Sequence, residues 1–194
     1  MITLSELSDD FANLITKELE YTEEKKEVIA YAIETALLSI FGTLLLIIFG
    51  LLVNALKPAL IAALSGVLLR RVSGGAHFNT PLKCLVSGAL VYSSIGLLAK
   101  TLVENYFFND YALLLLWLFS LIVVFLLAPV ESENKPINSV RLKSSLKVIS
   151  IIFVFVSSFI SFISGSLLIE VSMCSGVFCQ SLTLLPIFNR RGGD

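Results

Sequence analysis

Residues 111–130, YALLLLWLFSLIVVFLLAPV, form an apolar run that contains no charged side chain. A helix needs about 20 such residues to cross the roughly 30 Å hydrocarbon core of a bilayer. Hydrophobic residues make up 56% of the 194-residue chain, more than the roughly 45–50% of a soluble domain. We predict an all-α fold, a polytopic transmembrane helical bundle of six spans, because a helix satisfies its own backbone hydrogen bonds in lipid. The other five runs are residues 33–53, 56–69, 82–99, 148–169 and 171–188.

The shortest run and the connections between the later runs carry the remaining signals. Residues 56–69 are short for a span, so Lys57 must extend toward the surface or the bilayer must thin. Glu170 is the only charged residue between the last two runs, which indicates a tight hairpin there. The polar stretch 131–147, with Pro136 as a helix breaker, is predicted to be a loop.

The first 30 residues have a different pattern. Five large apolar residues lie at helical spacing on one face, which predicts an amphipathic helix. The segment holds three lysines against eight acidic residues, a balance that does not favour anionic lipid headgroups. We therefore expect it to lie at the cytoplasmic surface, packed on protein or on a peptide partner; the alternative is a solvated leader to the first span. The five apolar residues are Leu4, Leu7, Phe11, Leu14 and Ile15.

Cations set the expected topology. With the N-terminus inside, twelve of the 14 Lys and Arg residues fall on the cytoplasmic side, and only Lys57 and Lys100 fall outside. This bias predicts a multi-pass protein with both termini in the cytoplasm, together with the loop between the second and third spans. The expected parts are an amphipathic helix at 1–30, a transmembrane domain at 31–189 and a short cytoplasmic tail at 190–194. A net charge of −1 gives no basic face for nucleic acid.

The candidate site lies in a polar break, GGAHFNTP, at residues 74–81. His77 is the only histidine of the chain and precedes Cys84 by seven residues. A thiol protease needs these two groups, one to take a proton and one to attack a carbonyl. Thr80 as N-cap and Pro81 at the first helical position would start a helix, whose N-terminus would stabilise a Cys84 thiolate.

Other interpretations of these residues remain open. Gly74 and Gly75 can adopt φ > 0, and their N–H groups are a hypothetical oxyanion hole. A lone cysteine in an apolar helix is commonly a small hydrophobic residue, and we expect the same of Cys174 and Cys179. Two ligands are too few for a zinc site, and we expect no metal and no cofactor.

The string RRVSGGAH at residues 70–77, followed by Cys84, resembles the signature of the accessory gene regulator B (AgrB) family. Pro129 and KPI at 135–137 also resemble a loop of that family. The resemblance implies a membrane cysteine endopeptidase of Gram-positive quorum sensing, which makes 31–189 a transmembrane peptidase domain in the cell membrane. Its substrate would be an AgrD-like propeptide, cut near its C-terminus.

The resemblance also implies roles for single residues. Cys84 would be the nucleophile and His77 the general base, and a Cys84 thioester would be released by cyclisation to a thiolactone or lactone. Arg70 and Arg71 would hold the acidic region of the propeptide, or mark the cytoplasmic boundary. A homodimer is implied as well. The alternatives are a non-covalent peptide exporter and a membrane scaffold. The motif matches at Arg70, Arg71, Ser73, Gly74 and Gly75.

Overall fold

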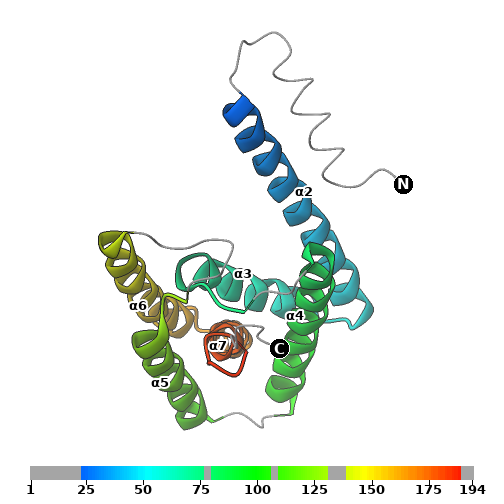
Figure 1. The fold of residues 1–194 in the computed structure, drawn as a ribbon. Helices are drawn as coiled ribbons and strands as arrows, with labels where there is room; N and C mark the ends of the chain where they lie inside the picture. Colours follow the sequence, from blue (N-terminus) through cyan, green and yellow to red (C-terminus); the bar gives the residue numbers. More distant parts are fainter. Residues whose placement is uncertain (1–22, 77–79, 106–108, 131–138, 189–194) are drawn as a thin grey trace. The chain divides into compact units, whose positions relative to one another are not determined.

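The computed structural model describes residues 23–76, 80–105, 109–130 and 139–188. The regular elements of these ranges are six helices, which confirms the all-α fold class (Figure 1). Four of them, α2, α4, α5 and α6, are long and apolar enough to cross a membrane. Helix α3 has 18 residues, as many as α5, but is less apolar, and α7 is apolar but has only 16 residues. The helices are α2 (Glu23–Leu52), α3 (Leu56–Ser73), α4 (Pro81–Glu104), α5 (Asp110–Leu127), α6 (Val140–Ile163) and α7 (Leu167–Leu182).

The chain divides after Leu45 into two units, each described by itself. The described part of the first unit belongs to α2, where Thr35, Ser39 and Thr43 each donate a hydroxyl to a carbonyl one turn earlier, at 2.8 Å. Such bonds satisfy polar groups inside an apolar helix. Most of the expected amphipathic helix, residues 1–22, lies outside the described residues, as does the tail 190–194. The boundary at residue 30 therefore stays a prediction.

Helix α6 begins eight residues earlier than expected, so residues 140–147 are helical and the loop prediction was wrong for them. Ser139 caps the helix: its hydroxyl accepts from the Leu142 N–H at 3.4 Å, and its carbonyl accepts from the Lys143 N–H at 3.0 Å. The side chains of the first turns are exposed. The polar composition therefore reflects a helix that continues beyond its apolar part.

The break between α6 and α7 also lies earlier than expected. It falls at residues 164–166, where Gly165 has a φ of +63°. Glu170, expected in the hairpin, lies in the first turn of α7. Acidic residues are common in the first turn of a helix, so Glu170 does not mark the end of a helix at this position.

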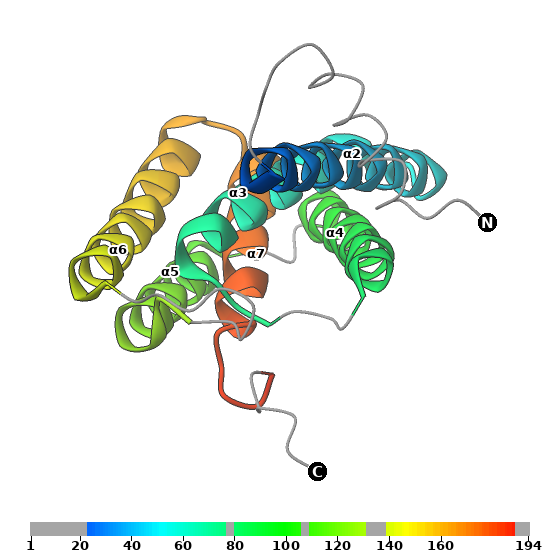
Figure 2. The same ribbon diagram turned by 45° about the horizontal axis from the view of Figure 1, so that its top comes forward.

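Helices α3 and α7 form the centre of the second unit, and α4, α5 and α6 pack around them (Figures 1 and 2). Small residues allow this close packing. A Cβ atom at Gly176 on α7 would lie 2.6 Å from the Ser65 hydroxyl on α3. A Cβ atom at Gly96 on α4 would lie 2.6 Å from the Ala59 Cα atom. The backbones of α4 and α7 thus approach α3 directly.

The outer helices are apolar outside and partly polar inside. On α6, Ser150, Ser157 and Ser161 are buried, whereas Phe155 and Phe159 are 56% and 65% exposed. A surface rich in exposed aromatic and aliphatic side chains is unfavourable in water and favourable in lipid. Together with the four apolar helices, this arrangement indicates a membrane protein.

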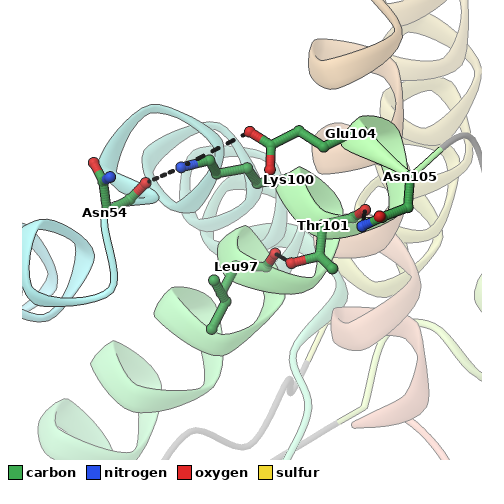
Figure 3. Close-up of polar contacts among 6 residues, drawn as sticks. All are labelled: Asn54, Leu97, Lys100, Thr101, Glu104 and Asn105. Carbon is green, nitrogen blue, oxygen red and sulfur yellow. Dashed lines mark hydrogen bonds and ion pairs between the residues drawn. The ribbon is translucent and has the colours of Figure 1, made fainter.

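Lys100, near the end of α4, joins that helix to the turn between α2 and α3 (Figure 3). Its ammonium group donates to the Asn54 carbonyl at 2.9 Å and lies 3.9 Å from the Glu104 carboxylate. Asn54 has a φ of +52°, a conformation that asparagine tolerates better than most residues. Lys100 contacts Asn54, two residues before α3 begins, and further along the pair Gly96 meets Ala59 and Tyr92 meets Gly66, so the two helices run antiparallel. The end of α3 and the start of α4 therefore lie at the same end of this helix pair.

Candidate active site

The end of α3 forms a tight turn of residues 73–76, called here the glycine turn. Gly74 is the C-cap of α3, with a φ of +69°, and its N–H donates to the Arg70 carbonyl at 3.0 Å. Gly75 has a φ of +135°, and a Cβ atom there would lie 2.5 Å from the Thr183 hydroxyl. The expectation that both glycines adopt φ > 0 is confirmed. No larger residue fits either position without a backbone shift.

Gln180, in the last turn of α7, holds this turn in place. Its amide nitrogen donates to the Gly74 carbonyl at 2.8 Å and to the Ser73 hydroxyl at 3.4 Å. Its amide oxygen accepts from Arg70 at 3.5 Å. Gln180 was not among the site residues predicted from the sequence, although an amide in an otherwise apolar helix is a signal of a specific partner.

Arg70 and Thr183 complete the support of the glycine turn. The Arg70 guanidinium donates to the Ala76 carbonyl, and the Ala76 N–H donates to the Thr183 carbonyl at 3.2 Å. The turn is therefore fastened at both ends, to α3 by Arg70 and to the end of α7 by Gln180 and Thr183.

A third segment, after α5, also contacts the turn. The Val130 N–H donates to the Ser73 carbonyl at 2.9 Å, and Gly74 and Val130 form an isolated parallel bridge. Pro129, which precedes Val130 and follows a cis peptide bond, belongs to the loop that resembles the family pattern. Residues 135–137 of that loop lie outside the described residues.

Cys84 lies in the first turn of α4. The helix begins at Pro81 after an extended Thr80, as expected, but Thr80 makes no side-chain capping hydrogen bond. The Cys84 N–H donates to the Thr80 carbonyl at 3.2 Å, and its side chain is partly exposed. His77 lies outside the described residues. Its pairing with Cys84 therefore stays a prediction.

Tyr92 on α4 packs closely against α3, since a Cβ atom at Gly66 on α3 would lie 2.9 Å from its ring. This contact lies further along α4 than Cys84, on the same pair of helices.

The other motif residues are divided between the interior and the surface. Arg70 is partly buried in the contacts described above, whereas Arg71 is exposed. The Gly74 N–H is bound to the Arg70 carbonyl, so this arrangement does not support Gly74 as an oxyanion donor. Cys174 is fully buried, with its sulfur 3.9 Å from the Leu113 carbonyl, in agreement with a packing role.

The fold and the site together define a polytopic helical membrane protein with a cysteine in the first turn of one helix and a supported glycine turn at the end of the preceding helix. The accessory gene regulator B family model matches residues 8–184, and the chain belongs to that family. Membership supports a role in the agr quorum-sensing system, in an AgrD-related context.

Two relatives extend this result. The chain is 31% identical over 199 residues to an AgrB-like protein of Clostridium perfringens, covering 96% of this chain and 93% of the relative. It is 33% identical over 119 residues to accessory gene regulator protein B of Staphylococcus epidermidis, covering 61% and 58% of the two chains. No solved structure matches the chain.

Proposed function

We propose that this chain is a membrane-embedded cysteine endopeptidase that cuts an AgrD-like propeptide near its C-terminus and promotes its cyclisation. The observation that carries the proposal is the position of Cys84 in the first turn of α4, at the same end of the antiparallel α3–α4 pair as the hydrogen-bonded glycine turn. The Cys84 side chain is partly exposed there, and the single histidine of the chain, His77, precedes it by seven residues in the sequence.

In the proposed reaction, the Cys84 sulfur attacks a propeptide carbonyl while His77 accepts the thiol proton. The peptide C–N bond then breaks, His77 returns the proton to the leaving amine, and the remaining acyl group is held as a Cys84 thioester. A thiol or hydroxyl within the propeptide attacks this thioester, which releases the Cys84 thiol and closes a thiolactone or lactone ring. Exclusion of water from the site favours ring closure over hydrolysis.

The proposed orientation places both chain termini and the site at the cytoplasmic face of a Gram-positive cell membrane. The antiparallel pair α3 and α4 supports it, because Arg70 and Arg71 end α3 where α4 begins with Lys83. Lys57 and Lys100 lie at the opposite ends of the same two helices. A strong cationic excess at one end is the pattern of a cytoplasmic face.

Within this proposal the two arginines have different tasks. Arg70 supports the glycine turn through Ala76 and Gln180. Arg71 is exposed and is the better candidate to hold the acidic region of the propeptide. A homodimer remains part of the proposal on the family resemblance alone.

The competing exporter would need polar groups that line a path through the membrane. The serines of α6 favour packing instead, because the Ser161 hydroxyl donates to the Ser158 carbonyl and the Ser158 hydroxyl to the Phe155 carbonyl, both at 2.9 Å.

The test uses the full chain reconstituted in lipid vesicles with a synthetic AgrD-like propeptide. Cys84→Ala and His77→Ala should each abolish cleavage, whereas Cys174→Ala and Cys179→Ala should cleave at the parent rate. Cleavage by Cys84→Ala at the parent rate would overturn the proposal.

A further inference from the structure

Gln180 combines three features that no other described residue of α7 combines. Its side chain is 1% exposed, it is polar at both ends of its amide, and both ends bind the motif at the end of α3. Burying an amide in an apolar helix is unfavourable unless its hydrogen bonds are made. Glutamine is therefore favourable at this position only because Gly74 and Arg70 supply its hydrogen-bond partners.

The partners also fix which way the amide points. The Gly74 carbonyl can only accept a hydrogen bond, so the amide nitrogen must face it. The Arg70 guanidinium can only donate, so the amide oxygen must face it. A glutamate would keep the contact with Arg70 but lose the donor to Gly74, and a methionine would lose both.

These contacts act on the segment that leads to the proposed general base. Gly74 sets the direction in which the chain leaves α3, and Ala76, which Arg70 also binds, directly precedes His77 in the sequence. The Gln180 amide on α7 therefore contacts Gly74 in the glycine turn directly and is linked to Ala76 at the end of the turn through Arg70.

We propose that Gln180 is a positioning residue of the reaction: it holds the glycine turn in the conformation that the proposed peptidase needs, without touching the substrate. This inference rests on the proposed function. It assigns α7, which carries none of the motif residues, to the support of the active site.

The kinetic test compares Gln180→Met and Gln180→Glu with Ser181→Ala, reconstituted as full chains and supplied with the synthetic propeptide. Ser181 is the matched control, because it is adjacent and equally buried but binds Phe178 and Ser120 instead of the turn. Both Gln180 variants should lose roughly 100-fold in kcat with KM within about twofold, since misplaced groups slow chemistry more than binding. Ser181→Ala should keep the parent values.

A double-mutant cycle separates positioning from general damage. If Arg70 and Gln180 act on one turn, Arg70→Lys combined with Gln180→Met should lose no more kcat than the worse single variant. Independent, multiplying losses would contradict a shared role.

The closing measurement needs no activity: hydrogen exchange of the backbone of residues 74–76 in vesicles. In Gln180→Met, or in Gln180→Glu if the first variant does not fold, this segment should exchange roughly tenfold faster while the centre of α4 is unchanged. If the Gln180 variant exchanges faster but the parent protein cleaves no propeptide, Gln180 is supported as the holder of the turn and the peptidase proposal is removed. Unchanged exchange with unchanged kcat would overturn the inference.

Discussion

The amide nitrogen of Gln180 and the carbonyl oxygen of Gly74 are 2.8 Å apart, although 106 residues separate them in the sequence. This bond joins the last helix of the chain to the turn at the end of α3. Because this bond supports the glycine turn, substitutions that disturb α7 should lower the rate of propeptide cleavage, although the proposed catalytic residues lie outside α7.

Gly75→Ala should disrupt the turn. The φ of +135° and the Thr183 hydroxyl 2.5 Å from the added Cβ atom both oppose it, and strain of this kind costs about 1–3 kcal/mol. Gly88→Ala is the control, because a Cβ atom there meets nothing within 4 Å. Thermal unfolding in detergent should show a lower melting temperature for Gly75→Ala and an unchanged melting temperature for Gly88→Ala. Equal stability of the two variants would contradict the turn as described.

Gly176→Ala should push α7 away from α3. Its new methyl group would lie 2.6 Å from the Ser65 hydroxyl and against the backbone of Ala62, and overpacking of this kind costs about 1–3 kcal/mol. Propeptide cleavage should fall as well, because α7 carries Gln180. A variant that retains full stability and full cleavage would show that α7 is not held closely against α3.

Arg70 and Arg71 should respond differently to substitution. Arg70→Lys removes the planar group that binds both Ala76 and Gln180, so kcat should fall roughly 10- to 100-fold. Arg71→Lys keeps an exposed charge and should be nearly neutral, whereas Arg71→Glu should raise KM in a salt-dependent manner. Steady-state cleavage assays at two salt concentrations measure kcat and KM for these variants. The reverse pattern would assign the propeptide contact to Arg70.

Lys100→Met should weaken the protein without affecting its chemistry. The variant loses the hydrogen bond to Asn54 at the end of α4 remote from Cys84, a loss of about 0.5–1.5 kcal/mol. Cleavage per folded molecule should be unchanged. Glu104→Gln, which removes only an exposed ion pair, should change stability by at most about 1 kcal/mol. A large drop in kcat for Lys100→Met would mean that the site extends to the other end of α4.

Local features of the site could be predicted from the sequence. The Thr80–Pro81 start of α4 and the positive φ of Gly74 and Gly75 depend on steric rules that act within a few residues. The limits of α6 and α7 were misplaced because polarity was interpreted as loop, whereas Ser139 caps a helix and Glu170 suits a helix N-terminus.

Long-range features could not be predicted in this way. Nothing near Gln180 in the sequence points to Gly74, and nothing distinguishes Arg70 from its neighbour Arg71. The contact between Gln180 and Gly74 and the difference between Arg70 and Arg71 both arise from the packing of α7 on α3. This packing depends on contacts such as that between Gly176 and Ser65. The one available signal was a single amide in an apolar segment.

The proposed reaction requires that Cys84 carries the propeptide as a thioester. Intact-mass spectrometry of the full chain, quenched in acid after mixing with the synthetic propeptide, can detect this thioester. We expect an adduct on Cys84 with the mass of the N-terminal propeptide fragment, removed by hydroxylamine, present in Cys174→Ala and Cys179→Ala and missing in Cys84→Ala. Cleavage of the propeptide by Cys84→Ala, with no adduct on the parent chain, would contradict it.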